Sequence, residues 1–208
     1  MHKGCRGRGC GRGALIWCSR TIRCSFIRSA NSPTAILRRS YVLLRQGGLS
    51  FAAHTNLDAA HGGVNETLCE MFGIHEAIPF DEGVGRIGKL KTTETLAVFA
   101  KRVEQGLHAD VSIAGGLEKP ISRVAVMGGS GGSSVALAAA QGADVLLTGE
   151  LKHSNALDAQ MLGLSLVVAG HYETEAIVLE PLMKRLQNEC FDVQYKLSRT
   201  DGSPFVRL

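Results

Sequence analysis

The chain has 208 residues, 45% of them hydrophobic and 20% charged, a composition typical of a globular protein with a substantial core. No apolar run approaches the ~20 residues that a membrane-spanning helix needs, which argues against a membrane protein. The net charge of +4 is uneven, because residues 1–57 hold ten Lys or Arg and no acid, whereas residues 58–208 hold 13 basic and 19 acidic residues. The basic character therefore belongs to the first segment, and residues 58–208 carry no nucleic-acid footprint.

Residues 1–30 are rich in Gly and Arg and show no periodicity. An Arg-rich, acid-free leader suits a mitochondrial transit peptide, although its glycines disfavour an amphipathic helix. The preferred alternative is a wrongly assigned start, with unrelated residues fused to a truncated domain. We expect an extension without stable structure over 1–30 and a domain over 31–208, located in the cytoplasm, or in mitochondria if the extension is a transit peptide.

Four of the six cysteines lie in the first segment at spacings that match no CxxC or zinc-finger pattern. Cys69 and Cys190 fall in apolar helical patterns and are expected to be small core residues. A disulfide-stabilised scaffold is therefore not expected, and a reducing compartment is the default.

The apolar periodicity switches repeatedly between helix-like and strand-like from Pro33 onward. The helix expected over 35–46 is closed by Gly47 and Gly48. The helix expected over 92–105 begins at Thr92 and carries Glu94 in its first turn, where the helix dipole favours a carboxylate. The other elements expected in this part are strands at 49–53 and 76–80, a strand or hairpin arm at 84–90 and a helix at 65–72.

The last eighty residues alternate more cleanly between strands and helices. Each expected strand is apolar throughout, which indicates a sheet covered on both faces with a parallel core. The expected fold class is α/β. The expected strands are 123–127, 144–148, 164–169 and 191–197, the helices 134–141, 153–162 and 174–188, and a glycine loop spans 128–134.

Four polar segments follow expected strands. Open α/β sheets bind ligands beyond the carboxyl ends of their strands. The four segments are therefore expected to share one edge. They are "HTNLDAA" (54–60), "GGSGGSS" (128–134), "TGELKH" (148–153) and "GHYETE" (170–175).

His171 and Glu175 are four residues apart and would meet on one face if this turn is helical. Histidine with carboxylate suits a zinc, manganese or iron site. The acids of this turn could instead simply complement the helix dipole. His54 and Asp58 repeat the spacing, where the alternative is an Asx-type turn. Together the two pairs would supply ligands for a two-metal site.

The glycine loop follows a strand and precedes a helix, a setting in which backbone N–H groups bind phosphate. It lacks the lysine of a P-loop, so a tight turn is the preferred interpretation, with phosphate binding by Gly129 and Ser130 as the alternative. Lys152 and His153 open the next helix. They are either contacts for an anionic substrate or solvated surface residues.

These segments, in this order, resemble the Nif-three-like (YbgI-like) family, whose members are often named GTP cyclohydrolase 1 type 2 homologues. The resemblance rests on "HTNLDAAHGGVNETL", "GRIGKL", "VAVMGGSGGSSV", "ADVLLTGELKHSNALDA" and "LVVAGHYETE", and covers roughly residues 36–197. It implies an α/β fold of mixed sheets flanked by helices, a homohexamer and a dinuclear metal site. Asp58, His171 and Glu175 would be metal ligands, and His54 a further ligand or proton carrier.

One family feature has no counterpart in this sequence. The resemblance implies two adjacent histidines in an upstream His-His-Pro segment, yet residues 3–53 contain no histidine. Ser154 and Asn155 also stand where the family often has a second His and an Asp. Since each metal ion needs about four donors, we expect this chain to bind fewer metal ions than its relatives.

The function expected from this resemblance is a metal-dependent hydrolase acting on a nucleotide-like small molecule. His54 would move the proton, Asp58, His171 and Glu175 would hold Zn, Mn or Fe, and Gly129, Ser130, Lys152 and His153 would bind a phosphorylated substrate. The alternative is a metal-binding scaffold or regulatory interaction protein without turnover. A truncated, inactive fragment is a third possibility.

Overall fold

The computed structural model describes residues 14–18, 49–191, 193–198, 202–203 and 205. The chain divides into two units, one made of Met1–Thr55 and Cys190–Asp201, the other of Asn56–Glu189 and Gly202–Leu208. The expected helix at 35–46 lies outside the described residues. Within the described residues, none of the helices has the length and apolar character that crossing a membrane requires.

The first unit contains a two-stranded antiparallel sheet. Strand β2 (Leu49–Ala53) confirms the strand expected at 49–53. It pairs with β1 (Ala14–Cys18), so that Ala14 lies opposite Ala53 and Cys18 opposite Leu49. Strand β1 was not expected from the sequence.

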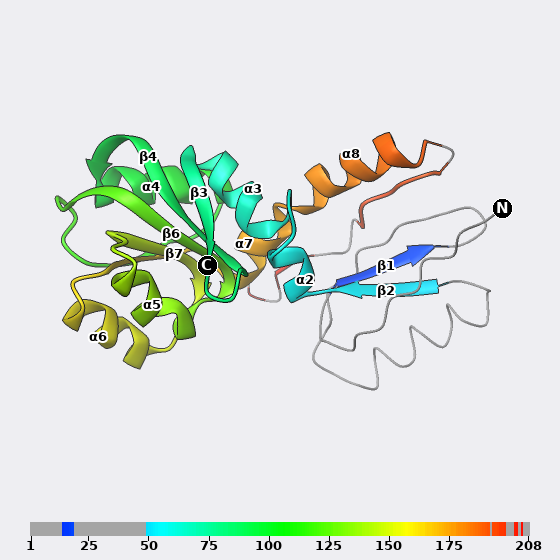
Figure 1. The fold of residues 1–208 in the computed structure, drawn as a ribbon. Coiled ribbons are helices and arrows are strands. Elements are labelled where there is room, and N and C mark those ends of the chain that lie inside the picture. The colour runs from blue at the N-terminus through cyan, green and yellow to red at the C-terminus, as the bar shows by residue number, and fades with distance from the viewer. Residues whose placement is uncertain (1–13, 19–48, 192, 199–201, 204, 206–208) are drawn as a thin grey trace. The chain divides into compact units, whose positions relative to one another are not determined.

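The second unit is built on a six-stranded mixed sheet with the order β3-β4-β6-β7-β8-β5 (Figure 1). β6, β7 and β8 run parallel to one another, whereas β3, β4 and β5 join the sheet in antiparallel pairs. The strands are β3 (Ile74–Phe80), β4 (Gly85–Thr95), β5 (Ser112–Ala114), β6 (Pro120–Ser130), β7 (Val145–Glu150) and β8 (Ser165–Val168). The α/β class and the parallel core are confirmed.

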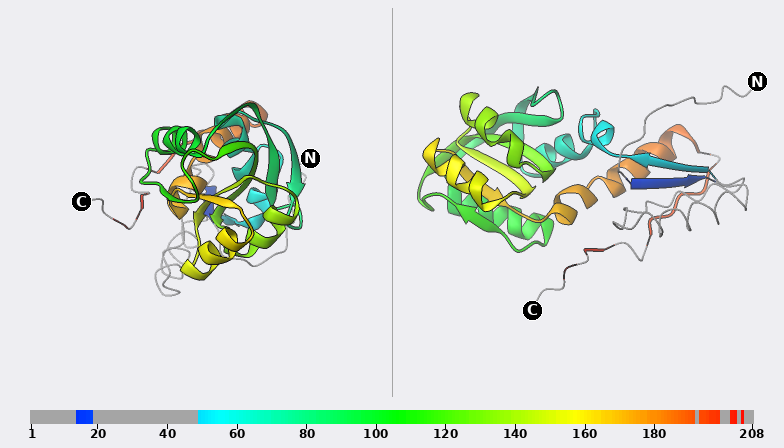
Figure 2. Two further views of the ribbon diagram at one scale, coloured as in Figure 1. Left: turned by 90° about the vertical axis from the view of Figure 1, so that its left-hand side faces the viewer. Right: turned by 90° about the horizontal axis from the view of Figure 1, so that it is seen from below.

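Helices cover both faces of this sheet, because neighbouring residues of a buried strand point to opposite faces. On β7, Leu147 packs in a core with α3 and α4, whereas Leu146 packs in a second core with α5 and α6. Figure 2 shows α6, in yellow, beside α5. The helices are α2 (Thr55–Asp58), α3 (Val64–Met71), α4 (Leu96–Leu107), α5 (Val135–Ala140), α6 (His153–Met161), α7 (His171–Ala176) and α8 (Leu179–Glu189), with a 3-10 turn at Gly132–Ser134.

The helix expected at 92–105 begins later than its sequence suggests. Thr92 to Thr95 belong to β4, and Glu94 pairs in register with Ile121. Three threonines among the four residues 92–95 favour a strand, because β-branched side chains pack well on a pleated surface. Thr95 is the N-cap of α4, and its side chain accepts a hydrogen bond from the Val98 N–H.

The expected helix at 174–188 is two helices, α7 and α8. Pro181 explains the break, because inside a continuous helix it would remove one backbone hydrogen bond and clash with the carbonyl four residues earlier. In the structure Pro181 lies in the first turn of α8, where its missing N–H costs little.

Three further expectations are corrected. The described residues of 191–197 form no strand beyond a single bridge residue, Tyr195. The glycine loop is shorter than expected, because β6 continues to Ser130, which pairs with Glu150 of β7. Cys69 is buried, but Cys190 is exposed and follows α8, because that helix ends at Glu189.

Candidate functional site

The carboxyl ends of β6, β7 and β8 lie at one edge of the sheet, as three of the four polar segments predicted. Met127, Thr148 and Val168 stand in register across the three strands. Beyond them the Gly170 N–H donates to the Gly149 carbonyl (3.0 Å), and the Gly131 N–H donates to the Glu150 carbonyl (3.2 Å). These bonds hold together the loops that carry the candidate residues.

The fourth segment was expected to leave a strand of this same sheet, and that expectation is wrong. It follows β2, which belongs to the two-stranded sheet with β1. Asp58, the last residue of α2, nevertheless lies in the second unit, close enough to Glu175 and His171 for both to act on its titration. Burial, together with the charge of Glu175, raises the pKa of Asp58 to about 6, and His171 lowers it in part.

His171 is the first residue of α7, so the helical interpretation of this turn is confirmed. Its Nε2 lies 2.9 Å from Oε1 of Glu175, one helical turn later. Its Nδ1 lies 2.9 Å from Oε1 of Glu150, the last residue of β7. The imidazole is therefore placed between two carboxylates.

The glycines of β6 pass very close to the first turn of α7. A Cβ on Gly129, whose φ is +69°, would lie 2.4 Å from Oε1 of Glu175 and 3.2 Å from Nε2 of His171. The Gly129 N–H donates to the hydroxyl of Thr174 (3.0 Å), a buried residue between His171 and Glu175. Gly129 is thus a neighbour of the acid and imidazole cluster, and its expected role in phosphate binding stays a prediction.

Asn65 connects three segments around this cluster from a fully buried position. Its Oδ1 accepts from the Gly128 N–H (2.8 Å), and its Nδ2 donates to the carbonyls of Val84 (2.8 Å) and Asp58 (3.3 Å). Because each bond joins a different backbone segment, Asn65 fixes Asp58 relative to the glycine strand. The roles of Asn65, Thr174 and Glu150 were not expected from the sequence. Two signals were available there: a polar residue on the apolar face of the expected helix at 65–72, and a carboxylate just beyond the end of an expected strand.

The remaining expected residues are less closely gathered. Ser130, Lys152 and His153 are exposed. A Cβ on Gly132 would lie 2.5 Å from Oδ1 of Asn155, so the turn after β6 packs against the start of α6, which His153 opens. His54 belongs to the first unit, where its Nδ1 lies 3.0 Å from the Thr55 hydroxyl. Its expected role in proton transfer stays a prediction.

The donor types at the cluster fit a divalent metal ion. One imidazole and the carboxylates of Asp58, Glu150 and Glu175 are the ligand types that zinc, manganese and iron take. Within the described residues, however, no group of three or more His, Cys, Asp or Glu side chains stands ready to hold an ion. Both ring nitrogens of His171 face carboxylate oxygens at 2.9 Å.

A family model described as Duf34/NIF3 (NGG1p interacting factor 3) matches residues 26–204. The chain belongs to the Duf34/NIF3 family. Its curated relatives include a GTP cyclohydrolase 1 type 2 homologue of Streptococcus pneumoniae, 34% identical over 76% of this chain and 64% of the relative. A homologue of the same name from Bacillus subtilis is 39% identical over 64% of this chain, but the match spans only 37% of that relative's length.

Two solved structures agree with the fold of this chain. Staphylococcus aureus protein SA1388 matches with a TM-score of 0.74 and 25% identity, over 86% of this chain and 75% of that one. Reduced HcgD from Methanocaldococcus jannaschii matches with a TM-score of 0.67 and 28% identity, over 82% and 68% of the two chains. The expected family and fold are therefore confirmed.

Proposed function

We propose that this Duf34/NIF3 protein binds a divalent metal ion at Asp58, His171 and Glu175 and hydrolyses a nucleotide-like small molecule. The observation that carries the proposal is that Asp58, far from them in sequence, lies close enough to His171 and Glu175 for both to act on its titration. His171 and Glu175 contact each other beside the Gly129 backbone. A bound ion would supply Lewis acidity, which makes a water more acidic and polarises an electrophilic group. The relatives named GTP cyclohydrolase 1 type 2 homologues suggest the substrate class.

The chain's own residues have distinct parts in this proposal. The Glu175 carboxylate must give up its contact with Nε2 of His171, so that both groups are available to the ion. Gly129 leaves the space that this rearrangement requires, because it has no side chain. Lys152 and His153, exposed beyond the end of β7, would attract the anionic part of a substrate. His54 would carry the proton. We further propose that the protein is cytoplasmic and forms a homohexamer.

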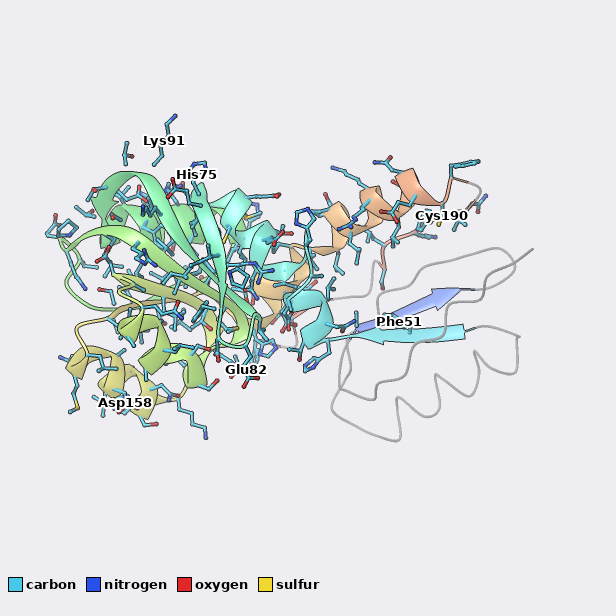
Figure 3. All side chains as sticks on the ribbon, viewed as in Figure 1. Phe51, His75, Glu82, Lys91, Asp158 and Cys190 are labelled. Carbon is cyan, nitrogen blue, oxygen red and sulfur yellow. The ribbon has the colours of Figure 1, made fainter. Side chains whose placement is uncertain are left out.

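Metal binding by paired histidine variants tests this proposal. We expect calorimetric titration with Zn²⁺ or Mn²⁺ to show saturable binding by the wild-type protein and its loss in His171→Ala. The matched control is His75→Ala, because His75 is exposed on β3, at the place labelled in Figure 3. GTP hydrolysis should likewise be retained in wild type and His75→Ala and lost in His171→Ala. Equal binding and equal turnover in wild type and His171→Ala would contradict the proposal.

A second candidate is a metal-binding scaffold that engages protein partners without turnover. The family description, which names an NGG1p interacting factor, favours it. Metal-dependent binding of a protein partner, with no turnover of GTP or related nucleotides, would support the scaffold over the hydrolase.

A further inference from the structure

Glu150 contacts the imidazole that the proposed metal site depends on, and no candidate ligand set from sequence includes it. Its Oε1 lies 2.9 Å from Nδ1 of His171, on the side of the ring opposite Glu175. We infer that Glu150 is a positioning residue, which accepts a hydrogen bond from the Nδ1–H of His171 and so directs Nε2 towards Glu175 and an incoming ion. The inference rests on the proposed function for its metal, but the contact between Glu150 and His171 is itself part of the structure.

The backbone around this contact is held on both sides. Ser130 pairs with Glu150 in the sheet, and the Gly131 N–H donates to the Glu150 carbonyl (3.2 Å). On the other side the Gly170 N–H, immediately before His171, donates to the Gly149 carbonyl (3.0 Å). Glu150 and His171 therefore lie next to each other because the glycines that precede them, Gly149 and Gly170, are joined by a backbone hydrogen bond.

Gly149 makes this approach possible. A Cβ at this position would lie 2.7 Å from the Cα of His171 and 2.6 Å from the carbonyl oxygen of Gly129. A side chain there would push the end of β7 away from α7 and separate Glu150 from the imidazole.

The contact is of little use for stability alone. The Glu150 side chain is 58% exposed and that of His171 37% exposed, and an ion pair this open to water stabilises a fold by ~1 kcal/mol at most. A carboxylate that accepts from the far nitrogen of a metal-binding histidine fixes the ring orientation and makes the near nitrogen a stronger donor, an effect of ~10- to 100-fold in metal affinity. Because Glu150 is largely exposed, we expect the lower end of that range.

Two substitutions at Glu150 separate orientation from charge. Glu150→Ala removes the acceptor, whereas Glu150→Gln keeps an oxygen that can accept from Nδ1–H but carries no charge. The first measurement is a two-bond proton–nitrogen correlation spectrum of histidine-labelled, metal-free protein. We expect the Nδ1 signal of His171 to move in Glu150→Ala and to return towards its wild-type position in Glu150→Gln.

The second measurement is Zn²⁺ affinity by calorimetry. We expect a loss of about 10-fold in Glu150→Ala and a smaller loss in Glu150→Gln. The control is Glu104→Gln, since Glu104 is exposed on α4 and should leave both measurements unchanged.

Three outcomes would overturn the inference: an unchanged Nδ1 signal in Glu150→Ala, an affinity within twofold of wild type, or a Glu150→Gln variant as weak as Glu150→Ala. The last result would mean that Glu150 acts through its charge, as a ligand does. If the wild-type protein binds no Zn²⁺ at all, the proposed function fails instead, and the nitrogen spectra alone decide whether Glu150 orients His171.

Discussion

At the scale of single residues, the candidate site depends on two residues, Gly129 and Thr174, that are not among its proposed metal ligands. Gly129 brings a backbone within reach of Glu175 and His171, and the Thr174 hydroxyl accepts its N–H. Neither residue takes part chemically in the proposed reaction. Both decide how closely β6 approaches α7, and hence how close the carboxylate and imidazole lie to the sheet.

Replacing Gly129 by alanine should therefore damage the site as well as the fold. A left-handed φ costs a non-glycine residue ~1–2 kcal/mol, and the new Cβ would also meet Glu175 Oε1 at 2.4 Å. We expect Gly129→Ala to lower the free energy of unfolding by more than ~2 kcal/mol and to weaken Zn²⁺ binding. Urea denaturation and calorimetry measure the two effects.

Gly142→Ala is the matched control for Gly129→Ala. Gly142 has a φ of +74°, and a Cβ there would meet nothing within 4 Å. It should show the backbone cost alone, with Zn²⁺ affinity unchanged. Equal losses of stability and equal affinities in the two variants would show that the close approach to Glu175 has no consequence.

At the scale of elements, α3 and β4 hold the turn that follows Asp58. The buried Arg86 of β4 donates to Oε1 of Glu66 on α3 (3.1 Å) and to the Ala59 carbonyl (2.7 Å). The Gly62 N–H donates to the other oxygen of Glu66 (2.8 Å). Burial raises the pKa of Glu66, but these hydrogen bonds and the Arg86 charge outweigh it, so that the pKa lies below its ordinary value.

The lowered pKa of Glu66 predicts a pH-dependent contribution to stability. A carboxylate with a depressed pKa stabilises the fold fully above its unfolded-state pKa, and the contribution is lost as the pH falls through the folded value. We expect Glu66→Gln to cost ~1.5–3 kcal/mol at pH 7, the range for hydrogen bonds to charged groups. The gap from wild type should narrow as the pH falls below the ordinary glutamate value of 4.5.

Urea denaturation between pH 7 and pH 3 measures that gap. Glu104→Gln, an exposed position on α4, is the control and should follow the wild type at every pH. A gap between wild type and Glu66→Gln that stays constant over the whole range would contradict the argument.

At the scale of the whole molecule, stability of the second unit is expected to come from both faces of the sheet. Leu146 and Leu147 are neighbours on β7, each fully buried, and they belong to different cores. Parallel strands buried on both faces are typical of α/β proteins. Neither face should therefore tolerate a cavity.

Leu146→Ala and Leu147→Ala should each lower the free energy of unfolding by ~2–5 kcal/mol, the range for a buried leucine replaced by alanine. Leu157→Ala on α6 is the control, because that side chain is 49% exposed and should cost less than ~1 kcal/mol. Thermal and urea denaturation measure all three. A near-neutral result at either buried leucine would show that one face contributes little.

The fold of residues 49–189 followed largely from hydrophobic periodicity. Continuous apolar strands such as Leu164–Ala169 and amphipathic segments such as Asn65–Phe72 are local patterns, so the α/β class and parallel core could be predicted. The end of β4 at Thr95 and the break between α7 and α8 near Pro181 did not follow from periodicity alone. A threonine-rich segment can extend a strand as well as open a helix, and only its pairing with Ile121 decided between them.

For the candidate site, the sequence by itself determined that His171 and Glu175 meet, because a four-residue spacing on a helix brings two side chains onto one face. It could not show that Glu150 faces the other side of the imidazole, or that Asn65 binds both the Asp58 carbonyl and the Gly128 amide. Glu150 lies 21 positions from His171, and Asn65 lies still farther from Gly128. The contact of Asn65 with Asp58 depends on which way the Asn65 amide points. Local spacing carries no information about these contacts, and only the tertiary structure decided them. The pairing of β7 with β6 and β8 brings Glu150 to His171, and the packing of α3 against β6 brings Asn65 to Gly128.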